Sequence, residues 1–425
     1  MKINNEQKDT LYLFVLQGMN YLIPILLMPF LMIKLGVKSY GLIGFSTAII
    51  QFLILFVDFG FNMSATKRVA VHKDNKVALS RIFFSTIFAK IVLLSISIFA
   101  FIIIINISKF HEYQIALLCT LPMLIGNTFT FTWFYQGIGH IRFLSVLSMC
   151  CRILILPSLF YFVKEAQDYI YAILINSSVY IVISIISIYW IYKNKLVILE
   201  KFSLRDMKFE IKESFPFFLS TASISLYTQL FVVILGLFTN PVVVGVYTAA
   251  EKIIRAISLL FYTPINQVYY PKIAHLASHN KQLALDTVGK VFKFSLYLMV
   301  FLSLTILLFS SFIEKFIGNE YEGISNLLMI LCLVPIFSAI GGVAGQMGLI
   351  AYIDSAKAKK TFQNIYIIAG LFAVFQVTIF TYLFQAEGTS FAVLSTEMFV
   401  AGLMIYYFKK YLKIEERNKT WQSKT

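Results

Sequence analysis

Long apolar runs recur along this chain and determine the environment in which it can fold. A transmembrane helix needs about 20 apolar residues to cross roughly 30 Å of hydrocarbon, and the sequence contains twelve runs of that kind. Because 59% of the 425 residues are hydrophobic and only 13% are charged, a water-soluble fold of this size cannot bury the apolar surface. The sequence therefore predicts an all-α polytopic membrane protein.

The apolar runs form two sets of six. Their expected positions are 11–33, 40–62, 83–105, 113–136, 143–163, 169–192, 214–238, 242–265, 291–312, 323–350, 362–384 and 388–408. An even number of spans places both termini on the same side of the membrane. With the N-terminus in the cytoplasm, the tails and inward loops hold 26 Lys and Arg residues and the outward loops hold 5. The positive-inside rule therefore predicts two cytoplasmic termini.

A long basic segment separates the two sets and predicts the domain boundaries. We expect a six-helix bundle, a cytoplasmic linker, a second six-helix bundle and a basic cytoplasmic tail, at 1–195, 196–213, 214–408 and 409–425. A weak internal repeat supports this division, because Tyr40-Gly41 after the first run has a counterpart in Gly245-Val246-Tyr247 after the seventh, about 200 residues later. Six spans return the chain to the same side, so the halves would have the parallel topology of some transporters.

The run at 242–265 is long enough to cross a bilayer but carries Glu251, Lys252 and Arg255 near its middle. Each central charge opposes insertion by roughly 2.5 to 3.5 kcal/mol, whereas each strongly apolar residue favours it by about 0.3 to 0.6 kcal/mol. At ~100° per residue, these charges share one helix face with Tyr247. This face needs a wet or protein-lined interior, where we expect the transport site. The alternative is that Glu251 and Arg255, spaced i,i+4, only neutralise each other and hold two helices together.

Other charged side chains also lie within the runs. Arg152 is nine residues into its run, so we expect it to face a cavity, and Lys90 is a candidate for the same surface or for snorkelling to the interface. Glu397, near the middle of the last run, can answer a cation of the polar face or carry a coupling proton. Asp58 and Glu251 are the other candidates for ion coupling, although Asp58 can instead order the basic loop that follows it.

Neutral polar side chains complete the expected transport surface. Gln17 and Asn20 lie on a narrow polar stripe of the first run, and Gln229 lies on a similar stripe of the seventh. The stripe on the first run corresponds to the stripe on the seventh, as expected for two related halves.

Several function classes are disfavoured by the sequence. The basic residues are spread over short loops, which argues against nucleic acid, and no GxxxxGK[ST] pattern indicates an ATPase. The four cysteines lie inside apolar runs without the spacing of a disulfide framework or zinc site. His275 and His279, spaced i,i+4, can share a metal ion, but without a third ligand nearby we prefer a solvated helix. We expect no metal and no cofactor, with coupling to a proton or sodium gradient left open.

Five short motifs resemble those of the Wzx-type flippases for O-antigen and other polysaccharides. They are DFGF at 58–61, WFYQG at 133–137, PFFLS at 216–220, VGVYTAAEKI at 244–253 and YPKIA at 270–274. The resemblance covers essentially the whole chain, and that family belongs to a superfamily with the MATE multidrug exporters and the lipid II flippases. It carries over Tyr247, Ala250, Glu251 and Lys252 as motif positions. Arg255, Arg152 and Lys90 are assigned from their chemistry alone.

The resemblance implies a transporter rather than an enzyme, with two six-helix bundles around a central cavity that opens alternately to either face. The implied substrate is an undecaprenyl-pyrophosphate-linked oligosaccharide, moved from the cytoplasmic to the periplasmic leaflet of the bacterial inner membrane during lipopolysaccharide biosynthesis. Lys252, Arg255 and Arg152 would then attract the pyrophosphate. Membrane lipid, a polysaccharide polymerase and a chain-length regulator are the expected partners.

Three alternatives stay open from the sequence. A MATE-like ion-coupled exporter of small cations would favour unpaired carboxylates, whereas the charged residues in the middle of these runs are more basic than acidic. A membrane-embedded polysaccharide polymerase generally needs a substantial outer loop, and every outward loop here is about ten residues or shorter. A scaffolding protein is disfavoured by the charged interior.

Overall fold

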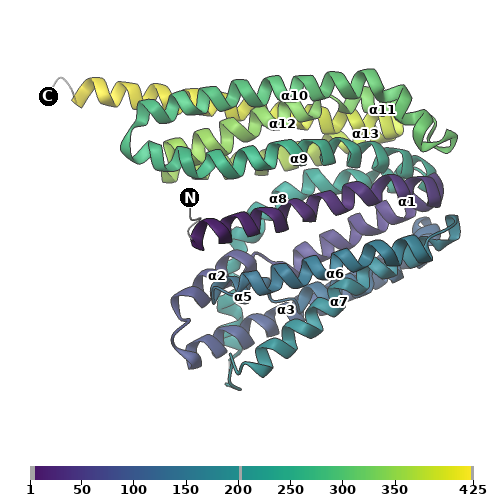
Figure 1. Cartoon of the computed structure of the whole chain (residues 1–425), viewed down its shortest axis with the longest axis horizontal. Helices are drawn as coiled ribbons and strands as arrows, with labels where there is room; N and C mark the ends of the chain where they lie inside the picture. The colour runs from purple at the N-terminus through teal and green to yellow at the C-terminus, as the bar shows by residue number, and fades with distance from the viewer. Residues whose placement is uncertain (1–4, 201–202, 423–425) are drawn as a thin grey trace. The chain divides into compact units, whose positions relative to one another are not determined.

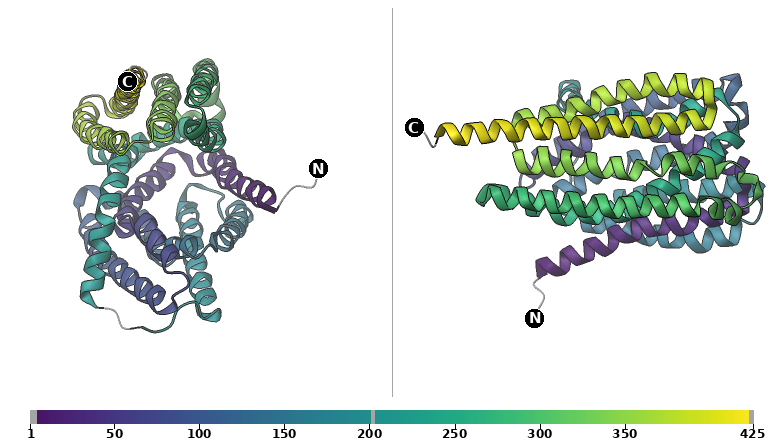
Figure 2. Two further views of the ribbon diagram at one scale, coloured as in Figure 1. Left: turned by 90° about the vertical axis from the view of Figure 1, so that its left-hand side faces the viewer. Right: turned by 90° about the horizontal axis from the view of Figure 1, so that it is seen from above.

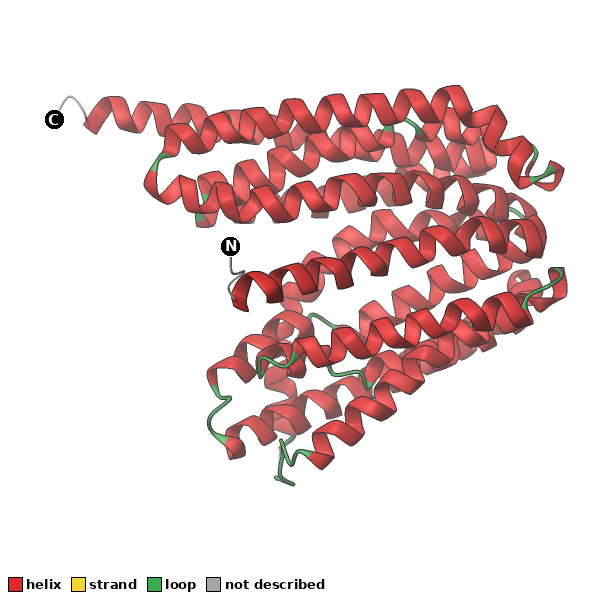
Figure 3. Cartoon of the chain, in the orientation of Figure 1, coloured by secondary structure: helices red, strands yellow, loops and turns green. Residues whose placement is uncertain are grey.

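The computed structural model describes residues 5–200 and 203–422, and within them it is helical without a β-strand (Figure 3). The side chains of residues 5–22, 24, 25, 220, 224, 226–228 and 415–422 lie outside the described part. Gln17 and Asn20, which we expected on the transport surface, belong to this group. The predicted all-α architecture is confirmed for the described chain.

The helices follow one another with short connections (Figure 1). The α-helices are α1 (Asn5–Asp58), α2 (Phe61–Val71), α3 (Lys76–Ile105), α4 (Gln114–Thr128), α5 (Thr132–Gly137), α6 (Ile141–Phe162), α7 (Tyr169–Lys193), α8 (Leu204–Phe238), α9 (Pro241–His279), α10 (Lys281–Ile317), α11 (Ile324–Leu331), α12 (Val334–Gly342) and α13 (Ala356–Gln422). A π-helix, η4 (Val343–Ile353), continues α12. Short 3-10 turns are η1 (Ser108–Tyr113), η2 (Ala166–Asp168) and η3 (Asn319–Tyr321).

Two of these helices are each a pair of helices joined at a kink. In α1 the backbone leaves helical geometry at Gly36, with φ 70° and ψ 172°, which glycine adopts because it lacks a Cβ. In α13 it does so at Gln385, with φ 47° and ψ −124°. The two kinks fall between the first and second expected runs and between the last two. Each long helix therefore corresponds to two consecutive apolar runs.

Eight helical segments among the described residues are long and apolar enough to cross a membrane. They include Leu26–Val71 and Ala356–Ile414, which contain the two kinks. The helix α9 is not one of the eight, in agreement with the charges at its centre. The chain is a multi-pass membrane protein, and the number of twelve spans stays a prediction.

The chain folds into two compact units. The first comprises residues 1–222 and 240–245, and the second comprises residues 223–239 and 246–425. Both α8 and α9 therefore contribute residues to each unit. In the second unit α10, α12 and α13 pack side by side, and Figure 2 shows them nearly end-on and from above.

The core of the first unit is built around the WFYQG motif. Trp133, Phe134 and Tyr135 have no exposed surface. Trp133 and Phe134 pack against Phe83 of α3, and Tyr135 packs against Trp190 of α7. The hydroxyl of Tyr135 donates a hydrogen bond to the carbonyl oxygen of Ser187 at 2.7 Å. These aromatic rings therefore hold the helices of this unit together and are not available to stack on a ligand.

The first unit also contains a close crossing of α1 with the start of α9. A Cβ atom on Gly41 would overlap the carbonyl oxygen of Pro241, and a Cβ atom on Gly245 would overlap that of Val37. Val37 and Pro241 are 204 residues apart, and so are Gly41 and Gly245. In each contact a glycine of one helix therefore lies against the carbonyl oxygen of the residue four positions before the equivalent glycine in the other helix. The residues of the predicted internal repeat therefore meet in the folded chain.

Candidate functional site

The charged face of α9 forms within one helix, as its spacing predicted. Arg255 donates a hydrogen bond from Nε to Oε1 of Glu251, one turn earlier. This is the i,i+4 pair of the alternative interpretation, in which the two charges neutralise each other. The arginine is nevertheless not enclosed by that contact, because 38% of its side chain is exposed, against 12% for Glu251. Arg255 can therefore still reach a ligand.

Three further residues act on this ion pair. Tyr247, one turn before Glu251, is fully buried and interacts electrostatically with both members. Its hydroxyl has no hydrogen-bond partner among the described side chains and backbone. Lys252 interacts electrostatically with Glu251. Glu397, far away in sequence on α13, interacts electrostatically with Arg255. The role of Glu397 as a carboxylate that answers a cation or carries a coupling proton stays a prediction.

A polar contact inside α13 positions Glu397. The chain reverses at Gln385, so the helical segments before and after the kink pack against each other. Gln376 donates a hydrogen bond from Nε2 to the carbonyl oxygen of Ala392 at 2.9 Å, and Ser395 donates one to Oε1 of Gln376 at 2.9 Å. Because Gln376 is buried, these bonds fix the rotation of the second segment. The orientation of Glu397 follows from that rotation.

The first unit holds a second buried charge cluster. Lys90, in the middle of α3, donates a hydrogen bond from Nζ to Oδ1 of Asp58 at 2.9 Å, and only 3% of its side chain is exposed. Asn127 of α4 donates a weaker one to Oδ2 of Asp58 at 3.4 Å. Lys90 therefore does not snorkel to the interface. The structure places two of the predicted site residues, Lys90 and Asp58, in direct contact.

The Lys90 ion pair allows a test of whether either residue serves transport. Lys90→Met is expected to lower the free energy of unfolding by about 2 kcal/mol, because it leaves Asp58 partly buried without its counter-charge. The double variant Lys90→Met with Asp58→Asn is expected to recover the stability, because both charges are then absent. Thermal unfolding and membrane abundance measure this recovery. If the recovered double variant also transports normally, the pair is structural only.

The remaining predicted residues lie in different places. Arg152 is half-buried on α6 in the first unit, and Gln229 is half-buried on α8 in the second. The rings of His275 and His279 stack at 4.5 Å at the end of α9. No group of three or more potential metal ligands occurs among the described residues. The structure therefore adds no third ligand to the two histidines.

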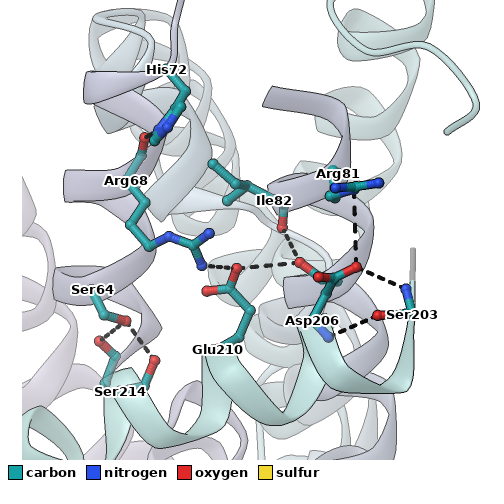
Figure 4. A network of polar contacts seen from close by, with 11 residues as sticks. Ser64, Arg68, His72, Arg81, Ile82, Ser203, Asp206, Glu210 and Ser214 are labelled. Carbon is teal, nitrogen blue, oxygen red and sulfur yellow. Dashed lines mark hydrogen bonds and ion pairs between the residues drawn. The ribbon is translucent and has the colours of Figure 1, made fainter. Parts of the chain in front are cut away.

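A network of polar contacts that the sequence analysis missed joins α2 and α3 to the start of α8 (Figure 4). Glu210 of α8 is 1% exposed and accepts hydrogen bonds from Arg68 and, at 3.3 Å, from the hydroxyl of Ser85. One turn later, the hydroxyls of Ser214 and Ser64 lie 2.5 Å apart. The first turns of α8 are therefore attached to the first unit.

A second ion pair in this network is more exposed. Arg81 lies 4.0 Å from Asp206, whose side chain is 33% exposed. A hydrogen bond from the backbone N–H of Ser203 lowers the pKa of Asp206. Burial raises the pKa of Glu210, and the charge of Arg68 opposes that rise. The sequence did contain a signal for this network. Glu210, Ser214 and Phe218 are spaced i,i+4 and therefore share one helix face, although Glu210 lies in the segment that we expected to be a linker.

Comparison with solved structures defines the class of protein. An inward-facing multidrug resistance transporter of the MATE family, in the MOP superfamily, superposes with a TM-score of 0.72 at 15% sequence identity, covering 93% of this chain and 96% of that one. The lipid II flippase MurJ, in an inward closed conformation, gives a TM-score of 0.69 at 15% identity, covering 94% and 90%. The fold is therefore the one shared by MATE and MurJ transporters.

Comparison with sequences identifies the family. The profile of the polysaccharide biosynthesis protein family matches residues 7–277. A protein of Escherichia coli strain K12 assigned as an O-antigen transporter is 31% identical over 405 residues, which are 95% of this chain and 96% of that protein. One of Shigella dysenteriae with the same assignment is 24% identical over 399 residues, covering 94% and 99%. The chain belongs to the polysaccharide biosynthesis protein family and is a transporter rather than an enzyme, which confirms the resemblance found in its motifs.

Proposed function

We propose that this protein is a flippase for a lipid-linked polysaccharide precursor in the bacterial inner membrane. The substrate would be an oligosaccharide repeat unit on undecaprenyl pyrophosphate, carried from the cytoplasmic to the periplasmic leaflet by alternating access. O-antigen or a related glycan is the product that its relatives suggest, since both are assigned as O-antigen transporters. The family, whose profile covers more than half of the chain, is named for polysaccharide biosynthesis.

The observation that carries this proposal is the partly exposed side chain of Arg255 on the charged face of α9. A guanidinium matches the geometry of phosphate oxygens and donates charge-assisted hydrogen bonds, which are stronger where water is scarce. Lys252 on the same face adds a second positive charge. Arg152 on α6 and Gln229 on α8 are further candidates for contact with substrate. The lipid tail would stay in the hydrocarbon while the sugars exchange hydrogen bonds with the stripes.

Transport of this kind also needs an energy source. Coupling to a proton or sodium gradient through Glu397, Glu251 or Asp58 is part of the proposal, as are two cytoplasmic termini. A polysaccharide polymerase and a chain-length regulator are the proposed partners on the periplasmic side, because a flipped repeat unit has to be joined to a growing chain. The lipid pyrophosphate that polymerisation releases would be the by-product of that later step.

The test replaces each arginine by glutamine, which keeps polarity and removes charge. Arg255→Gln is expected to lower polysaccharide display about tenfold at unchanged protein abundance, because one charge-assisted hydrogen bond is worth about 1.5 kcal/mol or more. Arg152→Gln is expected to act in the same direction. Lys293→Gln is a matched control, since Lys293 of α10 is an exposed cation and its loss should leave display unchanged.

Normal display at normal abundance in both arginine variants would count against the cationic site. Resistance to cationic drugs provides a separate readout for the alternative function. A strain that gains such resistance when it overproduces the protein, and shows no change in polysaccharide display, would support an exporter of the MATE type.

A further inference from the structure

Three buried polar atoms on α9 and η4 in the second unit lack hydrogen-bond partners. They are the hydroxyl oxygen of Tyr262 and the side-chain amide oxygens of Asn266 and Gln346. The residues that the structure describes, 5–200 and 203–422, offer none of them a hydrogen bond. An unpaired buried polar atom costs free energy, so a group of three in one place calls for a bound molecule that supplies the missing bonds. These atoms therefore mark a candidate binding site.

The topology of the second unit brings the three residues together. The chain reverses between α9 and α10 and again between α10 and α11, so α9 runs parallel to the continuous segment of α11, α12 and η4 (Figure 1). A Cβ atom on Gly342, the last residue of α12, would overlap the hydroxyl oxygen of Tyr262. Asn266 and Gln346 each follow this contact by four residues along their own helix. The two amides therefore lie at the same level, about one turn beyond the Tyr262 hydroxyl.

The backbone of η4 is itself unusual. It forms a π-helix over 11 residues, whereas π-helical geometry normally occurs as single-turn bulges, which are frequent at functional sites. Glycines let bulky side chains approach this backbone closely. A Cβ atom on Gly345 would crowd the ring of Phe362, and one on Gly348 would crowd the ring of Phe408. Gln346 is therefore held by a segment of a kind that is rare in purely structural helices.

The chemistry of the three side chains selects an uncharged ligand with hydroxyl groups. All three side chains are neutral, and α12 and η4 contain no Lys, Arg, His, Asp or Glu to balance the charge of a phosphate or a metal ion. Amide and phenol groups can both donate and accept hydrogen bonds, as sugar hydroxyl groups do. Aromatic rings of Tyr269, Tyr270 and Phe408 pack against the same hydrophobic cluster as Tyr262. Apolar and aromatic surroundings with a few polar groups are typical of small-molecule sites.

The candidate site continues the charged face of α9. Arg255 and Tyr262 are seven residues apart, and at ~100° per residue an i,i+7 pair lies on one face of a helix. Asn266 follows Arg255 by eleven residues, which places it within about 20° of the same face and about 16 Å further along the helix. A sugar attached to a pyrophosphate at Arg255 would extend along this face.

We propose that Tyr262, Asn266 and Gln346 form a subsite for an uncharged sugar of the lipid-linked oligosaccharide. This inference rests on the proposed function and names the part of the substrate that the second unit recognises. The two amides and the phenol exchange hydrogen bonds with sugar hydroxyl groups, which supply the partners that the three atoms lack. Because these atoms are buried where η4 packs on α9, the two segments have to separate before a sugar enters.

The test compares two pyrophosphate diesters that differ by one sugar. Dimethyl pyrophosphate carries the charge alone, and in methyl glucosyl pyrophosphate a glucose replaces one methyl group. Calorimetric titration of the purified full-length protein is expected to show that the glucosyl diester binds about tenfold more tightly. Equal affinities would overturn the subsite, and they are the result expected if the three atoms bind water alone.

Two variants assign the sugar contact to the amides. Asn266→Leu and Gln346→Met remove the hydrogen-bonding atoms with little change in volume. In both, the advantage of the glucosyl diester is expected to disappear while the affinity for dimethyl pyrophosphate is unchanged. The midpoint of thermal unfolding is expected to be unchanged or raised, because an unpaired polar atom is removed. A glucosyl advantage that persists in both variants, or a clear fall of both midpoints, would overturn the assignment.

Ser303→Ala is the matched control. Ser303 of α10 also has a buried hydroxyl without a partner in the described part of the chain, but it lies outside the hydrophobic cluster that contains Ile265 and Val343. This variant is expected to keep the full glucosyl advantage. Loss of the advantage in Ser303→Ala as well would show that the effect does not belong to the α9 and η4 residues.

The remaining outcomes separate the subsite from the function on which it rests. If dimethyl pyrophosphate binds in a manner that depends on Arg255 but glucose adds no affinity, the subsite is refuted and the cationic site stands. If neither diester binds to a protein that thermal unfolding shows to be folded, the cationic site fails and the proposed function loses its main support.

Discussion

Replacing Arg68 by methionine is expected to reduce the free energy of unfolding by about 3 kcal/mol. The substitution keeps the length of the side chain but removes the charge that faces Glu210, whose side chain is only 1% exposed. Breaking a buried ion pair from one side is costly because the remaining charge has no compensation. The expected result is a marked fall in membrane abundance and in the midpoint of thermal unfolding.

The exposed ion pair of the same network provides the control. Arg81→Met removes a cation that lies 4.0 Å from Asp206, a carboxylate with 33% of its surface exposed, so water can replace the interaction at a cost of about 0 to 1 kcal/mol. Adding Glu210→Gln to Arg68→Met is expected to restore most of the lost stability, because no buried charge is left. Equal losses in Arg68→Met and Arg81→Met would contradict this account of Glu210.

The effect of Arg68→Met also has a defined dependence on pH. Burial raises the pKa of Glu210 above its ordinary value of 4.5, and removing Arg68 takes away the charge that opposes this rise. The folded state of the variant then binds the proton more readily than the unfolded state does. Its stability is therefore greatest below the ordinary pKa and is lost as the pH rises through the raised pKa. The deficit of the variant should be smaller at about pH 5.5 than at about pH 8.

The second large effect is expected at the glycines where α1 crosses the start of α9. Gly41→Ala and Gly245→Ala each place a methyl group against a backbone carbonyl oxygen, that of Pro241 or that of Val37. Backbone atoms cannot rotate away as a flexible side chain can, so the helices have to separate. We expect each variant to lose about 3 kcal/mol, at the upper end of the usual cost of overpacking. Membrane abundance and thermal unfolding report the loss.

Two other helical glycines serve as controls for the crossing. A Cβ atom on Gly289 of α10 or on Gly402 of α13 would meet nothing within 4 Å. Alanine at either position should be neutral or stabilise the helix by roughly 0.5 to 1 kcal/mol. The double variant Gly41→Ala with Gly245→Ala should lose less than the sum of the two single losses, because one separation of the helices relieves both overlaps. Fully additive losses would show that the contacts are independent.

Much of the architecture was predictable from local properties of the chain. The apolar runs predicted a helical membrane protein, and the charges at the centre of 242–265 predicted that this segment differs from ordinary spans. The ion pair of Glu251 with Arg255 followed from i,i+4 spacing alone. Local spacing could not show that residues 133–135 are core, because an aromatic cluster at a helix end suits an interfacial anchor equally well.

The ion pairs between different helices could not be predicted from local spacing. Lys90 with Asp58 and Arg68 with Glu210 each join side chains from different helices. Periodicity placed several of these residues on a polar face, but it carries no information on which other helix that face meets. Glu210 lies in the segment 196–213, which we expected to be a cytoplasmic linker because it is rich in charged residues.

The difference lies in the range of the forces involved. Helix formation and membrane partition depend on residues within a few turns of one another, so apolar length and charge position can be interpreted one segment at a time. The choice of partner for a buried charge depends on how helices cross and rotate, which is fixed jointly by many distant packing contacts. The kink at Gln385 shows this, because the turn it makes brings Gln376 into hydrogen-bond distance of Ala392 and Ser395 in the following helical segment.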